Sequence, residues 1–471
     1  MINQNTIKRF LATAIFLSIP IAMADAQVQT EQKYSEKALS AYNFTDAIGI
    51  NAQPFRVLNH KHDLDFCTNI LAPALRDLGI AHLRTNAPWS LPKDPANNPD
   101  FVAFNCALSA GARLLLTITL QKDPGLQIGY SENPAAGGHT ELIPDLKNII
   151  TYLGVKNIDA IEGVNEYYHA NYLPIDEWQS NLLTYSGLVY HALKSDPGTE
   201  SVKIIGPSLN GEISTGPYSG IVDEGNMHFY DMPYDPSQNE VQAIQNEYKN
   251  LEKTVTAQSL TYGDKHKEIT ETGFSNCTIS TEKHSRNYYS SQQCVPEDVA
   301  AKNIGRQLLR YFVQGYSRIY IYQLIDHGPD ITNREDNFGL LTFSEDDTKG
   351  STMPKPVYYA LRNLMHILKD TDTDTKTGSL DFSLSGDLGN IKHVLLEKSD
   401  GSFYLAIWQA LDSSPSPNAV AVQLTLTNPS NIQIYASLTS ENPISSASNV
   451  KTIGLSVPDY VMIIKIVPIT Q

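Results

Sequence analysis

Short β-rich runs alternate with longer helical patterns from about residue 41 to residue 370, and this alternation restricts the fold more than any other feature of the chain. The runs interpreted as strands lie at 47–51, 81–84, 113–120, 158–164, 203–206, 227–230, 268–270 and 318–324. Helical spacing of apolar residues occurs between or after them, at 70–78, 142–153, 178–193 and in the segment that Pro356 opens. Eight strands separated by helices predict an α/β fold, a (β/α)8 TIM barrel over residues 41–370.

A doubly wound open sheet is the main alternative to the barrel, but no glycine-rich phosphate loop follows the first strand.

The sequence pattern changes after Asp370. Short alternating strands follow, separated by Gly, Pro, Asn and Ser, at 391–397, 403–409, 419–426, 431–436 and 459–467. They predict a small all-β sandwich over residues 378–471, to which residues 27–40 can add a strand.

The first 26 residues have the pattern of a secretory signal peptide. Lys8 and Arg9 precede an apolar stretch at 10–24, and the segment 22–26 offers cleavage sites of the small-x-small kind. A membrane anchor is the alternative interpretation. No later stretch is long and apolar enough to span a bilayer, so we expect a secreted or periplasmic protein without a membrane partner.

The net charge and the cysteine content narrow the choice of binding partners and indicate disulfides. The formal net charge of −16 argues against nucleic acid or an anionic membrane as a partner. The four cysteines, an even number in an exported chain, favour disulfides. Three connectivities are possible, and we expect the nearest-neighbour one, Cys67–Cys106 and Cys277–Cys294. No Cys-x-x-Cys or nearby histidine pair indicates a metal site.

Two carboxylates end predicted barrel strands. Glu166 closes Gly163-Val164-Asn165-Glu166 after the fourth strand, and Glu271 follows the seventh in Thr270-Glu271-Thr272-Gly273. The carboxyl ends of barrel strands meet at the rim where catalytic residues lie. Hydrolysis of a glycosidic bond needs one carboxyl to protonate the leaving oxygen and another to attack or to activate water. A single glutamate at a strand end is usually only solvated, so the prediction rests on the pair.

These two motifs resemble those of the clan A retaining glycoside hydrolases, which have (β/α)8 barrels and often an appended β-sandwich. Members carry an Asn-Glu pair at the end of strand four and a nucleophilic Glu at the end of strand seven. The resemblance spans most of residues 45–370. It implies that Glu166 is the acid/base, that Glu271 is the nucleophile and that Asn165 binds the sugar 2-hydroxyl.

Three further positions match the clan, and they are Arg84 at the end of strand two with His228 and Tyr230 on strand six. The resemblance implies that Arg84 lies beside the nucleophile, where its charge keeps Glu271 ionised. His228 and Tyr230 are expected near the same carboxylate. Glu162, on strand four, is interpreted as structural.

The chemistry itself sets two further expectations. Glu166 must carry a proton to act first, so a raised pKa is expected for it. A retaining enzyme needs its two carboxyl groups about 5–5.5 Å apart. The reaction requires no metal and no organic cofactor.

Strand eight departs from the clan pattern. Many members end it with a tryptophan beneath the sugar, whereas this chain has Tyr320 to His327 with Gln323 between them. Gln323 can hydrogen-bond a hydroxyl but cannot stack on a ring. Trp89 and Tyr167 are the aromatic candidates for that role, with ordinary packing as an equal alternative.

The sequence therefore predicts a secreted retaining glycoside hydrolase that acts on β-linkages of an oligo- or polysaccharide. A non-catalytic carbohydrate-binding protein on a barrel scaffold and a transglycosylase with the same residues are the alternatives. The sugar, the linkage and the oligomeric state stay open.

Overall fold

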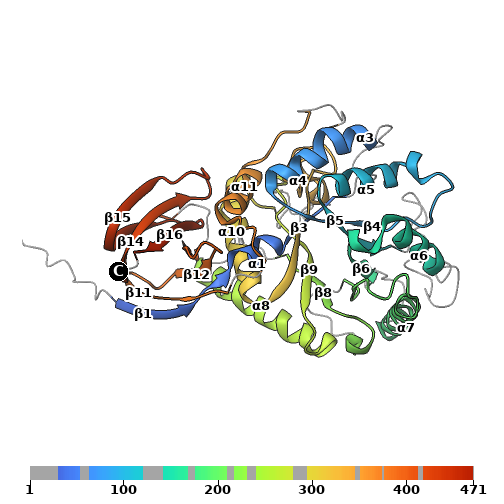
Figure 1. Ribbon diagram of the computed structural model, residues 1–471, viewed down its shortest axis with the longest axis horizontal. Coiled ribbons are helices and arrows are strands. Elements are labelled where there is room, and N and C mark those ends of the chain that lie inside the picture. The colour runs from blue at the N-terminus through green and yellow to red at the C-terminus, as the bar shows by residue number, and fades with distance from the viewer. Residues whose placement is uncertain are drawn as a thin grey trace, which may run out of the picture.

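A barrel and a β-sandwich make up the protein (Figure 1). The computed structural model describes residues 30–52, 63–119, 142–167, 175–208, 217–230, 240–278, 294–344, 351–373, 376–411 and 417–469. The predicted signal peptide, 1–26, lies outside the described residues. Within those ranges, none of the helices combines the length and the apolar character needed to cross a bilayer.

Eight parallel strands form the first sheet. They are β3 (Ile48–Asn51), β4 (His82–Asn86), β5 (Arg113–Ile118), β6 (Ile158–Val164), β7 (Ile204–Ile205), β8 (Gly225–His228), β9 (Lys267–Thr272) and β10 (Tyr316–Ile321). Neighbours pair in the order β7-β6-β5-β4-β3-β10-β9-β8. The two ends of this order meet, because Ile205 and Glu224 form a parallel bridge and Gly206 N–H donates to the Glu224 carbonyl oxygen at 3.0 Å. The sheet therefore closes into the predicted barrel, and each of the eight expected strands is present.

Helices surround the barrel (Figure 1). In chain order the helical segments are α1 (Ala41–Asp46), α3 (Asp63–Phe66), η1 (Cys67–Leu71), α4 (Ala72–Leu78), η2 (Pro95–Asn97), α5 (Pro99–Ser109), α6 (Leu142–Leu153), η4 (Val155–Asn157), α7 (Ile175–Lys194), η6 (Tyr218–Gly220), α8 (Glu240–Tyr262), α10 (Glu297–Val313), η7 (Arg334–Asn337) and α11 (Pro356–Leu368). α11 shows why they pack here, since Val357, Leu361, Leu364 and Leu368 recur at helical spacing and all are buried.

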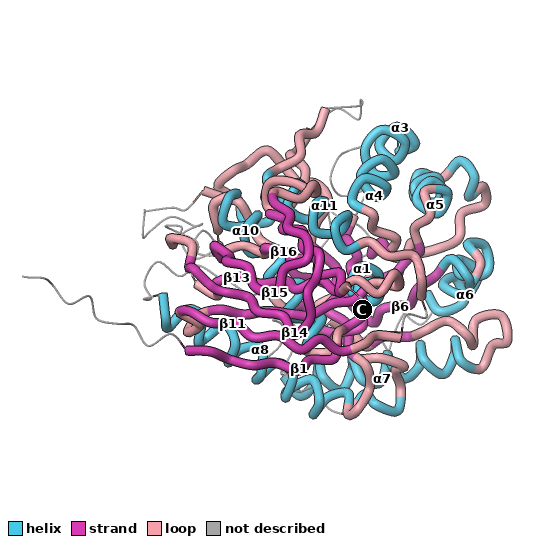
Figure 2. Tube along the Cα trace, turned by 60° about the vertical axis from the view of Figure 1, so that its left-hand side comes forward, coloured by secondary structure: helices cyan, strands magenta, loops and turns pink. Residues whose placement is uncertain are grey.

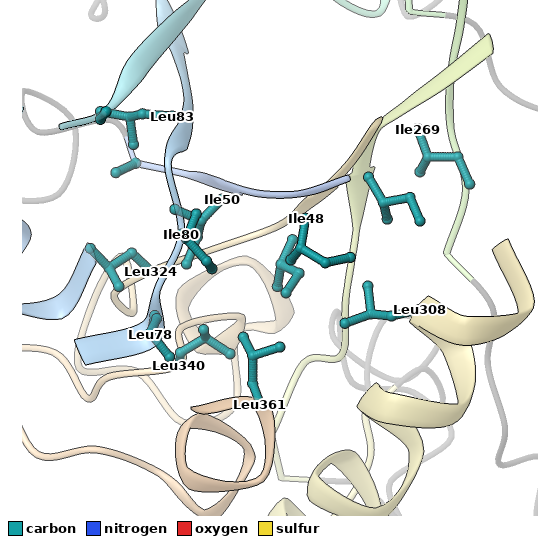
Figure 3. Close-up of a cluster of buried hydrophobic side chains, with 14 of the residues drawn as sticks. Ile48, Ile50, Leu78, Ile80, Leu83, Ile269, Leu308, Leu324, Leu340 and Leu361 are labelled. Atoms are coloured by element: carbon teal, nitrogen blue, oxygen red, sulfur yellow. The ribbon is translucent and has the colours of Figure 1, made fainter. Parts of the chain in front are cut away.

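The core has two layers. Between strands and helices, Ile48 and Ile50 of β3 lie among side chains from other strands and from α10 and α11, including Leu308 and Leu361 (Figure 3). Inside the barrel, a small cluster contains Tyr320 of β10. Its ring lies so close to Gly49 that a Cβ there would be 2.4 Å from a ring carbon, so a glycine is needed beside it.

The second sheet is all β (Figure 2). Its strands are β1 (Thr30–Lys37), β2 (Leu39–Ser40), β11 (Ser379–Gly386), β12 (Ile391–Glu397), β13 (Phe403–Gln409), β14 (Val420–Ala436), β15 (Ser445–Val457) and β16 (Met462–Pro468), in the order β1-β11-β14-β16-β13-β12-β2 with β15 on β14. Residues 30–40 thus supply two strands to this sheet. The separate strands expected at 419–426 and 431–436 were wrong, because β14 runs through both with a register shift between Thr425 and Ser430.

The sandwich packs against helices α10 and α11. Arg306 of α10 donates from Nη1 to the carbonyl oxygens of Leu411 (2.9 Å) and Asp459 (3.0 Å), and Asn363 of α11 donates from Nδ2 to the Ser437 carbonyl oxygen (3.0 Å). Buried sandwich side chains, including Trp408, belong to the same hydrophobic cluster as the barrel helices. One face of the sandwich therefore joins the barrel's hydrophobic cluster at the outer helices, while its remaining buried side chains form a cluster of their own.

Two disulfides join the expected neighbours, Cys67 with Cys106 and Cys277 with Cys294, with Cα–Cα distances of 6.1 and 5.1 Å. The nearest-neighbour prediction is confirmed. The first links η1 to α5. The second fixes the segment that follows β9, only six positions beyond Glu271.

Candidate active site

The two predicted carboxylates converge at one end of the barrel. Glu271 lies on β9, and Glu166 follows β6 by two positions. One carboxylate oxygen of each, together with a ring nitrogen of His228 from the end of β8, all lie within 4.8 Å of one another. The side chains of Glu166 and Glu271 are 25% and 10% exposed, so both reach the surface of the same site.

Arg84 of β4 holds the Glu271 carboxylate from one side. The guanidinium is buried, and its Nη1 donates to Glu271 Oε1 at 2.6 Å and to Asn51 Oδ1 at 2.7 Å. Its Nη2 donates to Asn165 Oδ1 at 2.8 Å. One side chain thus positions both Glu271 and Asn165.

Glu162 in turn holds Arg84. Its carboxylate is fully buried on β6 and accepts from Arg84 Nε at 2.5 Å and Nη2 at 2.8 Å. Three further donors complete its shell, and they are Thr117 Oγ1 (2.8 Å), Asn226 Nδ2 (3.0 Å) and Thr270 Oγ1 (3.1 Å). Burial alone would raise the pKa of Glu162, but the charge of Arg84, its hydrogen bonds and the charge of His228, 3.8 Å away, outweigh burial and hold the pKa at about 2. A buried carboxylate is stable in its charged form only when its charge is paired and its oxygens accept hydrogen bonds, as they do here.

His228 lies between the two candidate catalytic carboxylates. Its Nδ1 is 2.7 Å from Glu166 Oε1 and 3.4 Å from Glu271 Oε2. Burial lowers the pKa of His228, but the charge of Glu271, the nearby Glu162 carboxylate, and the hydrogen bond to Glu166 raise it to about 9. The imidazole is therefore protonated at neutral pH and donates to Glu166.

Tyr230 holds the other oxygen of the nucleophile candidate. Its hydroxyl donates to Glu271 Oε2 at 2.8 Å. Burial, followed by the negative charge of Glu271, raises the pKa of Tyr230 well above its usual value, so the phenol keeps its proton and remains a donor. Glu271 is thus fixed at Oε1 by Arg84 and at Oε2 by Tyr230.

The backbone at Glu166 is unusual. Its φ of +45° lies in the left-handed region, which costs a residue with a side chain about 1–2 kcal/mol. The N–H of Glu166 donates to Ser208 Oγ at 2.8 Å. Neighbouring structure, and not local preference, therefore sets where this carboxylate points.

Glu166, His228 and Glu271 form the one group among the described residues whose ligand atoms are close enough for a metal ion. A protonated imidazole offers no lone pair to a metal, and His228 holds its proton to a pKa of about 9.

Three further residues predicted to contact the substrate differ in their surroundings. Tyr167 is fully buried in the main hydrophobic cluster, so its expected stacking on a sugar conflicts with the structure. Trp89 lines an apolar pocket beside α6 with Ile118 and Tyr185. Gln323 is 1% exposed, and its side-chain amide has no hydrogen-bond partner within the described ranges.

The sequence analysis assigned no role to two aromatic residues that lie around Tyr230, the hydrogen-bond partner of Glu271. The ring of Phe338 is 5.5 Å from that of Tyr230 and 5.4 Å from that of Tyr322, between ring centres. Tyr322 is two positions beyond Tyr320, which points into the barrel, and strand alternation places such residues on the same face. That spacing was the available signal for Tyr322.

No protein-family profile and no curated protein matches the sequence. Solved structures do. A glucosidase from Croceicoccus marinus aligns with a TM-score of 0.55 at 11% identity, covering 92% of this chain and 97% of the other. AbfB, a family 51 α-L-arabinofuranosidase from Bifidobacterium longum, aligns with 0.54 at 10% identity, covering 93% and 99%.

A family 39 glycoside hydrolase from Bacteroides cellulosilyticus WH2 aligns with a TM-score of 0.50 at 14% identity, covering 90% of this chain and 82% of the other. The chain has the fold of these glycoside hydrolases. The alignments extend over most of the chain, and a likeness at this level of identity concerns the fold alone.

Proposed function

We propose that this protein is a retaining glycoside hydrolase that cleaves β-glycosidic bonds of an oligo- or polysaccharide by double displacement. The observation that carries the proposal is the convergence of Glu166 and Glu271, with oxygens within 4.8 Å of each other at the carboxyl end of the barrel. Retaining enzymes keep these groups about 5–5.5 Å apart, whereas inverting enzymes need about 6.5–9.5 Å to admit a water.

In the first step, Glu271 attacks the anomeric carbon while Glu166 gives its proton to the leaving oxygen. The bond from the anomeric carbon to the leaving oxygen breaks as the bond to the Glu271 carboxylate forms. Arg84 and Tyr230 hold the two oxygens of Glu271, so the nucleophile needs little reorganisation before it attacks.

In the second step, the ionised Glu166 takes a proton from water, and the water oxygen attacks the anomeric carbon. The bond to Glu271 breaks, and the sugar leaves with its original configuration. His228 donates to Glu166 at 2.7 Å, so its positive charge stabilises the ionised form that this step needs and opposes the protonated form with which the first step begins.

Glu162 keeps the buried charge balanced during both steps. When Glu271 becomes an ester, Arg84 loses one anionic partner but keeps its two hydrogen bonds to Glu162. An unpaired buried cation would be costly, so Glu162 supports the covalent intermediate.

Asn165 is proposed to bind a sugar hydroxyl. Its Oδ1 accepts from Arg84 Nη2, which leaves the amide NH2 as the group available to a ligand. The 2-hydroxyl is the expected partner, because a bond to it strengthens in the transition state.

We also propose that the protein is exported. The signal-peptide pattern and the two disulfides support this location, because disulfides persist in oxidising compartments.

The proposal is tested by following the reaction on a panel of aryl glycosides with proton NMR. A product that first forms with the configuration of the substrate supports the two-step mechanism. First-formed product of inverted configuration contradicts it, and products elongated by an acceptor sugar indicate a transglycosylase.

A further inference from the structure

A cation lies beside the candidate nucleophile without a role in the proposed reaction. Arg334 begins η7, in the segment after β10. The central carbon of its guanidinium is 5.0 Å from the centre of the Phe338 ring and 5.7 Å from that of Tyr230. Because the Tyr230 hydroxyl donates to Glu271, a single aromatic ring separates this cation from the site of attack.

The backbone around Arg334 is fixed from two sides. The Arg334 carbonyl oxygen accepts from Ser275 Oγ at 2.8 Å, and Asn276 N–H donates to the Asn337 carbonyl oxygen at 2.9 Å. These bonds join the segment after β10 to the segment after β9, and β9 is the strand that carries Glu271. Asn333 Oδ1 caps η7 by accepting from Glu335 N–H at 3.2 Å. The position of the guanidinium relative to Glu271 is therefore set by the fold.

Among the residues that the structure describes, Arg334 has few hydrogen-bond partners. Its side chain is 22% exposed, and Nε is buried with no partner among the residues that the structure describes. The one bond within those residues runs from Nη1 to Oε1 of the neighbouring Glu335 at 3.2 Å. Glu335 is 59% exposed, and ion pairs with an exposed carboxylate are weak and readily exchanged.

Glu335 also faces the catalytic pair. Desolvation raises the pKa of Glu335, Arg334 lowers it, and the negative charges of Glu271 and Glu166 raise it further. The Arg334–Glu335 pair consequently lies within electrostatic reach of both carboxylates.

We propose that Arg334 binds an anionic group, a sugar carboxylate or a sulfate ester, on a residue next to the one that is cleaved. This inference rests on the proposed function. A guanidinium packed against two rings presents a planar fork of N–H donors that matches the oxygens of a carboxylate or sulfate. A neutral sugar hydroxyl would accept a hydrogen bond but would not neutralise the positive charge. Glu335 occupies Nη1 in the free protein and gives way to the ligand.

The test compares three oligosaccharides that differ in one sugar, which is a neutral hexose, its uronate or its sulfate ester. The wild-type protein is expected to prefer one of the anionic forms, and which one identifies the group. Arg334→Gln should lower kcat/KM on that form by about tenfold to a hundredfold and affect the neutral form much less. Glu335→Gln, which removes the competing carboxylate, should raise kcat/KM on the anionic form.

Arg362→Gln is the matched control, because Arg362 also packs on a tyrosine ring, at 5.5 Å from the centre of Tyr359 on α11. It should leave all three substrates unchanged. A wild-type preference for the neutral form, or an equal loss on all three with Arg334→Gln, overturns the inference.

Binding to the Glu271→Gln protein, measured by calorimetry, separates this inference from the proposed function. If the wild-type protein cleaves none of the three but anionic binding still depends on Arg334, the proposed function fails and the anion site stands. If cleavage occurs and neither binding nor kcat/KM depends on Arg334, the anion site fails alone.

Discussion

Glu162 and Arg84 form a buried two-point ion pair, and the opposite side of the same guanidinium holds Glu271. The carboxylate, the guanidinium and the candidate nucleophile thus form one continuous chain of charges. Arg84 interacts with two carboxylates at once. A substitution at Glu162 should therefore affect the function of Glu271, although Glu162 is fully buried below the site.

Glu162→Gln should therefore lower both stability and turnover. Breaking one side of a buried pair costs about 3–5 kcal/mol, so the Tm should fall. Arg84 then keeps no anionic partner when Glu271 forms its ester, so kcat on an aryl glycoside should fall as well. Glu441→Gln is the control, since Glu441 is exposed on the sandwich and pairs with His366. An unchanged kcat in a folded Glu162 variant would show that Glu162 does not support the covalent step.

Glu271→Gln should abolish turnover, by at least about 10⁴-fold in kcat, because an amide is a poor nucleophile and the covalent step is lost. The fold should persist, because Tyr230 and Arg84 keep their other contacts. Circular dichroism and steady-state kinetics on an aryl glycoside check the two expectations together. Activity close to that of the wild type would remove Glu271 from its assigned role.

Glu166→Ala should lose activity most on substrates with poor leaving groups, because these depend on protonation of the leaving oxygen. Aryl glycosides with good leaving groups should still form the covalent intermediate. Added azide should then restore turnover and yield a glycosyl azide of the substrate's configuration. An unactivated glycoside cleaved equally well by variant and wild type is the contrary result.

His228 should make stability depend on pH above neutrality. Its pKa of about 9 in the folded protein exceeds the usual 6.5, so the folded state binds its proton more tightly than the unfolded state. The resulting stabilisation is complete below about pH 6.5 and is lost as pH rises through about 9, with a size on the order of 3 kcal/mol. The measurement is the urea unfolding free energy of the wild type and His228→Gln at pH 6, 7.5 and 9. If the unfolding free energies of the two proteins changed in parallel with pH, His228 would not be the source of the pH dependence.

Where a local pattern was strong, the sequence predicted the elements well. The apolar run at 158–164 coincides with β6, and the helical spacing at 142–153 coincides with α6. β15 was missed because most of its side chains are exposed, so no alternation marks it. The long α8 was missed for a similar reason, since its apolar residues are few and scattered.

The same distinction explains which parts of the site were predictable. Residues at strand ends, such as Arg84, His228 and Glu271, can be inferred from the barrel geometry once the strands are known. For Tyr167, stacking on a sugar and ordinary packing were equal alternatives, and its full burial agrees with packing. Arg334 could not be found at all, because the fold brings it to Tyr230 from a segment with no periodic pattern.

The most direct measurement of the central claim is covalent trapping. The protein is incubated with the 2-deoxy-2-fluoro glycosyl fluoride of whichever sugar it hydrolyses fastest, then digested and examined by mass spectrometry. The double-displacement mechanism predicts one added glycosyl group, on Glu271, with slow recovery of activity as the ester hydrolyses. A label on any other residue, or inactivation without a covalent adduct, would contradict it.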